Sequence, residues 1–366
     1  MPASTSDKKN HGTNRKDAPD DNAGVLVHDM KPMGLRHLER PPLSVILKLY
    51  DLFNTIKQRS PPSPHKTEHL RLITIRVSHY NEKARWGFDL MEEDKDSPYY
   101  YTEDTHPAGF QALESVRASK GQYSATPMVV ENDGATVYAK SDVVLRHYCP
   151  FLYPTAHKQE IEQLEDDWGN RLGPAIRTYA YGALLQKEQW PNLVKMNTGP
   201  ECATIENLLF PYMLSVIKPA LEKSLKINDH SVALAEQTIR DVFQEASERL
   251  ANNHNNKKQQ NSFLVGNSFT AADLTFAALS SPLIRPPELK TFQAPLEPLP
   301  IQTQALIHEM QATPAGQHVL HMYRTQRYPN DPNRVVQIKC AGRNRIPWIT
   351  VVGVAAVVVA AIKVAM

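Results

Sequence analysis

The chain has 366 residues, of which 22% are charged, and its formal net charge is +2. This length allows two domains of ordinary size, and the near-neutral charge provides no basic field for binding nucleic acid. Cys149, Cys202 and Cys340 are widely spaced and form no CxxC motif, which argues against a disulfide framework or a zinc site and indicates a reducing compartment.

The N-terminal part of the chain is polar over residues 1–40 and lacks the apolar core of a secretory signal. It has too little apolar surface to offset chain entropy, so we expect it to be disordered. Residues 41–66 combine an amphipathic helix with a proline-rich linker. This helix either packs on the folded body or lies on a membrane surface, and its polar face, which is not strongly basic, favours packing.

Residues 67–152 alternate between strand and helix patterns. We expect strands at 70–77, 97–104, 126–132 and 135–140, and helices at 81–94, 110–120 and 141–149. The turn Asn132-Asp133-Gly134 predicts a hairpin between the last two strands. The order βαβαββα predicts a small mixed sheet with helices on both faces, which is an α/β fold.

Residues 153–330 contain no convincing strand pattern. Helical windows at 157–188, 204–226 and 231–253 dominate this part, so we expect an all-α bundle domain. A basic linker at 331–345 follows it.

One segment of the helical half carries a recognisable signature. Thr270 and Asp273 form a capping box, and Phe269 with Leu274 supplies a hydrophobic staple. The surrounding stretch, FLVGNSFTAADLTFAAL at 263–279, resembles the N-capping signature of the C-terminal domain of glutathione S-transferases. TPAGQHVLHMYRTQR at 313–327 is similar to the closing helix of a subgroup of that family. The resemblance implies a thioredoxin-like domain at 67–152 and a helical domain at 153–330.

The segment VSHYNEKARWGFDL at 77–90 resembles the strand-to-helix turn that carries the catalytic residue in this family. By that match, Ser78 is the catalytic residue and hydrogen-bonds the sulfur of glutathione. A hydroxyl at a helix N-terminus favours a thiolate over a thiol, which suits this role. The alternative is that Ser78 is only a helix N-cap. Asn81 stands where redox-active members often have a second cysteine, so disulfide chemistry is not expected.

The resemblance also implies a glutathione-binding set. Thr126-Pro127 matches the family's cis-proline, which turns the preceding backbone toward the cysteinyl part of glutathione. Ser141 and Asp142 begin the next helix, where the family holds the γ-glutamyl group. Lys140 departs from the family pattern, because an acid or a glutamine is usual at that position.

Residues 346–366, IPWITVVGVAAVVVAAIKVAM, follow a basic cluster and have a run of 17 uncharged residues before Lys363. About 17 to 21 helical residues span roughly 26 to 31 Å, the thickness of a hydrocarbon core. The run is apolar on every face and has a tryptophan at its inner edge, which favours a single transmembrane helix over a buried core helix. We therefore expect a tail anchor, with both domains facing the cytosol.

Two functions remain open. The first is a membrane-anchored transferase that uses glutathione as co-substrate, needs no metal, and conjugates the glutathione thiolate to hydrophobic electrophiles. The second is a non-catalytic adaptor on an organelle outer membrane. The tail resembles those sent to the mitochondrial outer membrane, with the endoplasmic reticulum and peroxisome as alternatives. The resemblance also implies a homodimer.

Overall fold

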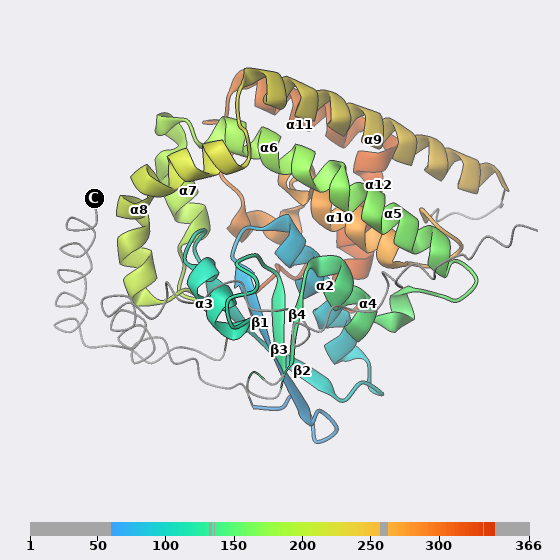
Figure 1. Ribbon diagram of the computed structural model, residues 1–366. Coiled ribbons are helices and arrows are strands. Elements are labelled where there is room, and N and C mark those ends of the chain that lie inside the picture. Colours follow the sequence, from blue (N-terminus) through green and yellow to red (C-terminus); the bar gives the residue numbers. More distant parts are fainter. Residues whose placement is uncertain (1–59, 132–133, 135, 257–262, 332, 341–366) are drawn as a thin grey trace, which may run out of the picture.

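The computed structural model describes residues 60–131, 134, 136–256, 263–331 and 333–340. The segment 1–40, the amphipathic helix expected before residue 60 and the span expected at 346–366 lie outside the described residues. Within the described ranges, no helix has both the length and the apolar character that crossing a bilayer requires. Figure 1 shows a small sheet lying against a larger group of helices.

The first half is built on a four-stranded mixed sheet (Figure 1). Its spatial order is β2-β1-β3-β4; β2 is parallel to β1, whereas β3 is antiparallel to β1 and to β4. The strands are β1 (Glu68–Ile75), β2 (Tyr99–His106), β3 (Met128–Glu131) and β4 (Thr136–Ala139). The helices between and after them are α2 (His79–Glu93), α3 (Gln111–Ala118) and α4 (Ser141–Tyr148). The predicted order βαβαββα is confirmed.

Successive side chains of a strand point to opposite faces, and the sheet uses this to build two cores. Leu70 and Leu72 of β1 join Trp86 of α2 in the largest hydrophobic cluster. Ile73 faces the other way and packs with Met128, while Ala118 at the end of α3 lies against that second cluster. Helices α2 and α4 therefore cover one face of the sheet and α3 covers the other.

The second half, over residues 153–256 and 263–331, contains only helices and their connections. The α-helices are α5 (Lys158–Asn170), α6 (Leu172–Leu184), α7 (Trp190–Asn197), α8 (Thr204–Ser224), α9 (Asp229–Asn256), α10 (Ala271–Ile284), α11 (Ile301–Ala312) and α12 (Pro314–Met322). Shorter turns are η4 (Pro150–Leu152), η5 (Lys187–Gln189), η6 (Pro287–Phe292) and η7 (Tyr323–Arg327). The predicted fold class, a thioredoxin-like α/β half followed by an all-α half, fits these residues.

The helical window predicted at 157–188 is two helices rather than one. The break falls at Arg171, between α5 and α6. Pro174 has no backbone N–H and cannot donate the hydrogen bond that would continue the helix to residue 170. Gly173 also allows close packing here, because a Cβ at this position would lie 2.2 Å from the Tyr80 hydroxyl oxygen.

Helix α10 joins the two halves. Every side chain of α10 except that of Pro282 is buried, and the helix contacts α2 of the first half as well as α5, α6 and α12. The capping box predicted at its start is present, because Thr270 Oγ1 accepts from the Ala272 N–H and Asp273 accepts from the Thr270 N–H. The N-terminus of this central helix is therefore fixed by its own side chains.

The described end of the chain, residues 333–340, lies along the edge strand β2. The N–H of Glu103 donates to the Lys339 carbonyl at 3.0 Å. The Lys339 ammonium lies 2.6 Å from carboxylate oxygens of both Asp89 and Glu92. An exposed strand edge offers unpaired backbone groups, and Lys339, in the segment expected as part of a basic linker, pairs with one of them at Glu103.

Candidate functional site

Ser78 lies at the turn between β1 and α2. Its N–H donates to the Ile75 carbonyl at 3.2 Å, and its own carbonyl accepts from Asn81 and Glu82. Ser78 has extended backbone angles, φ −75° and ψ 126°, as an N-cap residue does, but its side chain makes no capping hydrogen bond. The hydroxyl is thus not used to close the helix. It stands at the positive end of the α2 dipole.

The Thr126–Pro127 peptide bond is cis, as the resemblance implied. Asn81, in the first turn of α2, links this bond to the Ser78 turn. Its Nδ2 donates to Thr126 Oγ1 at 3.1 Å and to the Ile75 carbonyl at 3.0 Å. Asn81 is fully buried, and its Oδ1 has no hydrogen-bond partner among the described residues. A buried acceptor of this kind is costly unless a ligand N–H or a water satisfies it.

Ser141 and Asp142 begin α4, after Lys140 with a positive φ of 75°. Ser141 is buried, whereas Lys140 is exposed. Asp142 lies within electrostatic reach of Tyr80: burial raises the pKa of the Tyr80 hydroxyl to about 12, and the Asp142 charge contributes to that increase. Of the residues predicted to bind glutathione, Thr126 contacts the first turn of α2 through Asn81, and Asp142 lies near the same turn at Tyr80.

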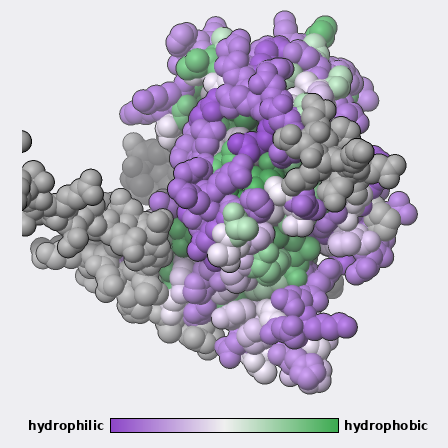
Figure 2. Space-filling view, turned by 90° about the vertical axis from the view of Figure 1, so that its right-hand side faces the viewer, coloured by the Kyte–Doolittle hydropathy of each residue, from purple (hydrophilic) through white to green (hydrophobic). Residues whose placement is uncertain are grey.

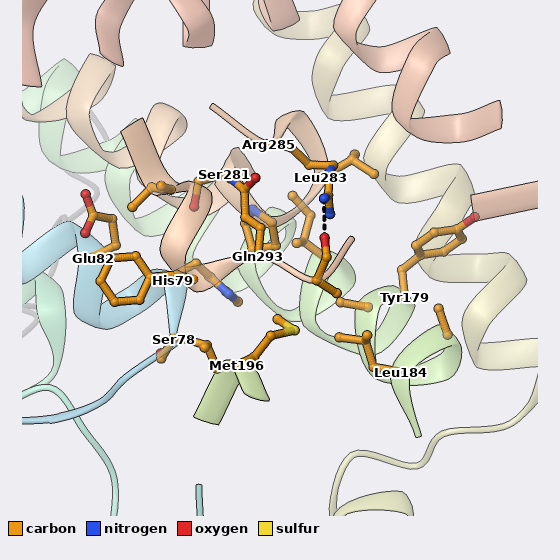
Figure 3. Close-up of a pocket in the computed structure, with 18 of the residues that line it drawn as sticks. Ser78, His79, Glu82, Tyr179, Leu184, Met196, Ser281, Leu283, Arg285 and Gln293 are labelled. Atoms are coloured by element: carbon orange, nitrogen blue, oxygen red, sulfur yellow. Dashed lines mark hydrogen bonds between the residues drawn. The ribbon is translucent and has the colours of Figure 1, made fainter. Parts of the chain in front are cut away.

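An apolar cavity adjoins Ser78 on another side of this turn (Figure 3). Its volume is about 90 Å³, measured at the centres of water-sized spheres. It is enclosed by the N-terminus of α2, one face of α6, the end of α10 with η6, and α11. Thr126, Pro127, Ser141 and Asp142 do not line it. Ser78 is the predicted site residue that borders the cavity.

Several residues at the cavity were not predicted as site residues. Tyr179 lines it from α6 (Figure 3), whereas Tyr181 packs in a separate cluster. Arg85 of α2 lines the cavity while its guanidinium pairs with carboxylates. His79, the residue that follows Ser78 in the sequence, also faces the cavity (Figure 3). The only sequence signal for His79 was its position beside Ser78.

Three arginines bring positive charge to the cavity, and each has an acceptor. Arg76 Nη1 donates to the Met196 carbonyl at 2.6 Å. Arg85 lies 2.5 Å from Glu103 and also pairs with Glu82. Arg285, at the end of α10 with a left-handed φ of 57°, donates to the Ala294 carbonyl (Figure 3). The cavity is therefore apolar on its helical walls, and the guanidinium groups that border it already have acceptors within the protein.

The face in Figure 2 shows hydrophobic surface in the middle, framed by hydrophilic residues. In the described part of the chain, no cluster of three or more histidine, cysteine, aspartate or glutamate side chains is arranged to hold a metal ion.

The mixed sheet with strand order β2-β1-β3-β4, its cis-proline and the helical second half match the arrangement that the sequence resemblance implied. No family model matches the sequence, and no curated protein matches it.

Several solved structures are similar to this chain at low sequence identity. The yeast protein Ure2p in complex with glutathione is 15% identical, with 76% of this chain and 99% of that chain covered and a TM-score of 0.41. The glutathione S-transferase Xi from Phanerochaete chrysosporium is 11% identical, with coverage of 77% and 86% and a TM-score of 0.43. The theta class enzyme from Xanthomonas axonopodis pv. citri, with glutathione bound, is 17% identical, with coverage of 69% and 98% and a TM-score of 0.39.

Proposed function

We propose that this protein is a glutathione S-transferase-type enzyme that holds glutathione at the N-terminus of α2 and transfers it to a hydrophobic electrophile in the adjoining cavity. The observation that carries the proposal is the Ser78 hydroxyl, which makes no helix-capping bond and lies where the cavity meets that helix end. An N-cap role alone would leave this hydroxyl bonded to the helix.

The site can bind both reactants, the thiol of glutathione and the electrophile. The Ser78 hydroxyl donates to the glutathione sulfur, and together with the α2 dipole it lowers the pKa of the thiol. The thiol proton leaves to solvent. The thiolate then forms a C–S bond to the electrophilic carbon, and the leaving group departs with its electron pair.

The remaining partners of glutathione follow from the same turn. In this proposal, the backbone before the cis-proline and Asn81 Oδ1, which has no partner among the described residues, hydrogen-bond to the cysteinyl part of glutathione. Ser141 and Asp142, at the N-terminus of α4, face the γ-glutamyl group in this proposal.

The test is to replace Ser78 in the full-length protein, purified in detergent. Ser78→Ala should lower the turnover of a small aromatic electrophile by about 100-fold, the cost of removing one preorganised donor. Retention on immobilised glutathione should persist, because the other contacts remain. Ser215→Ala, which alters an exposed serine on α8, is the matched control and should keep full turnover. Equal rates in Ser78→Ala and wild type would refute the assignment of Ser78.

Lys140 favours a second candidate, a non-catalytic adaptor with the same fold. Its ammonium is exposed at the start of α4, where the resemblance places an acid opposite the γ-glutamyl ammonium, and two cations repel there. Wild-type protein that shows neither retention on glutathione nor conjugation supports the adaptor. Retention together with conjugation excludes it.

We further propose that residues 346–366 anchor the protein in a membrane as a single-pass tail, with its domains in the cytosol. The support is the length and apolar character of that run. The mitochondrial outer membrane is favoured, and a homodimer is the proposed assembly. A fluorescent protein fused to residues 335–366 should colocalise with a mitochondrial outer-membrane marker, whereas a diffuse cytosolic signal would rule the anchor out.

A further inference from the structure

We propose that the cavity beside Ser78 takes a small apolar molecule that carries a hydroxyl or N–H donor, and that His79 Nε2 accepts the hydrogen bond from it. His79 is thus a specificity-determining residue. The inference deepens the proposed function. It rests on that function only where the bound molecule is identified as the electrophile. The binding step itself does not involve glutathione.

The hydrogen bonds of the His79 ring identify its tautomer. The side chain is only 6% exposed, and its Nε2 has no hydrogen-bond partner among the described residues. The ring makes a hydrogen bond to the backbone of Gly173 that favours the protonated form, so Nδ1 carries the hydrogen and donates. Nε2 then holds a lone pair. Figure 3 shows this ring turned toward the interior of the cavity.

The charge state of His79 limits what it can recognise. Burial and the nearby charge of Arg177 lower the pKa of the imidazole to about 3. At neutral pH the ring is uncharged, and its Nε2 can accept a hydrogen bond but cannot donate one. A carboxylate or another anion offers no donor to this atom. A phenol, an alcohol or an amide N–H does.

The three arginines of the cavity are hydrogen-bond donors and cannot accept from the ligand. Arg76, Arg85 and Arg285 each already donate to an acceptor, as described above. His79 Nε2 is a buried acceptor without a partner, and leaving such a group unsatisfied is costly. A ligand donor that reaches it recovers that cost.

The remaining walls select an apolar body. Aliphatic and aromatic side chains enclose the cavity from α6, α9 and α11, among them Ile176, Tyr179, Leu184, Ile239 and Ile307. The volume of about 90 Å³ holds several water-sized spheres, since one water needs roughly 10–15 Å³ on this measure. A single substituted aromatic ring suits such a space.

Four probes that share a tolyl ring test the inference in full-length protein without glutathione: toluene, 4-methylanisole, p-cresol and 4-methylbenzoate. Toluene has no polar group, 4-methylanisole offers an acceptor, p-cresol offers a donor, and 4-methylbenzoate is an anion. The dissociation constants are measured by ligand-observed NMR. We expect p-cresol to bind about ten-fold more tightly than toluene or 4-methylanisole, with 4-methylbenzoate weaker than p-cresol. Tightest binding of 4-methylbenzoate, equal binding of toluene and p-cresol, or no binding overturns the proposal.

A variant assigns the preference to His79. His79→Phe should bind toluene as wild type does and lose the preference for p-cresol, while His147→Phe, which alters an exposed histidine on α4, should keep it. A preference that survives in a folded His79→Phe overturns the assignment. If that variant does not fold, the ¹⁵N resonance of His79 Nε2 in wild type decides, because it must shift with p-cresol and not with toluene.

Glutathione retention is measured separately on the same protein. A preference for p-cresol without retention on glutathione would reject the proposed transferase and leave this binding site standing. Retention on glutathione and conjugation without a preference for p-cresol would reject this binding site and leave the proposed transferase standing.

Discussion

Asp273 lies fully buried at the start of α10, where its two oxygens serve several donors. It accepts from the Leu264 N–H at 2.9 Å, from the Thr270 N–H and hydroxyl at 3.1 Å, and it lies 3.1 Å from His318 Nε2. One side chain therefore ties the preceding loop, the helix cap and α12 together. Its removal leaves buried donors without an acceptor.

Asp273→Ala should lower the free energy of unfolding by about 3 kcal/mol, because a capping loss of about 1 kcal/mol adds to the cost of stranded buried donors. Asp229→Ala is the matched control, since Asp229 also lies in the first turn of a helix but is exposed; its effect should stay within about 0.5 kcal/mol. Urea unfolding followed by circular dichroism measures both. Similar losses in the two variants would contradict this role of Asp273.

Single residues also set the limit of what the sequence could predict about the site. The Ser78 turn, the Thr126–Pro127 bond and the start of α4 each lie within a short stretch with a local signature. His79 has no such signature, because its role depends on Gly173 and on a cavity whose walls lie far along the chain.

At the scale of elements, local patterns predicted most of the first half. Its strands are short and separated by turns, so alternation and turn residues fix their order, and the observed β1 and β2 lie within two residues of the expected starts. The helical half is less determined by local pattern. The split between α5 and α6 depends on Pro174, and α7 and η6 are too short to give a clear period.

The cavity is an assembly of elements rather than a property of any one of them. Its walls come from α2, α6, the end of α10 and α11, which are separated by long stretches of chain. The sequence of each helix shows only that it has an apolar face. The packing of the helices decides which of these faces leave a space between them. The same holds for the pairing at the edge of β2, because a strand edge can be paired by any extended segment.

At the scale of the whole molecule, His106 links the two halves. It ends β2 and is 1% exposed, with its Nδ1 2.8 Å from Glu206 of α8 and its Nε2 3.0 Å from Asp104. Asp104 also lies 3.1 Å from Arg71. Although burial opposes the charge on His106, the two carboxylates outweigh it and raise the pKa of the imidazole to about 10. His106 is therefore a buried cation at neutral pH.

This ion pair across the halves predicts how stability depends on pH. The folded pKa of about 10 lies above the unfolded value of roughly 6.5. The stabilisation is therefore complete below about pH 6.5 and disappears as the pH rises through 10. Glu206→Gln removes one carboxylate and should lower the folded pKa, so the decline should move to lower pH. The stability difference between wild type and Glu206→Gln should be on the order of 2 kcal/mol at pH 6 and shrink toward pH 10. Urea unfolding at pH 6, 8 and 10 measures this difference. Groups that titrate equally in both proteins cancel in the comparison. A difference that is constant with pH would show that His106 is not charged in the folded protein.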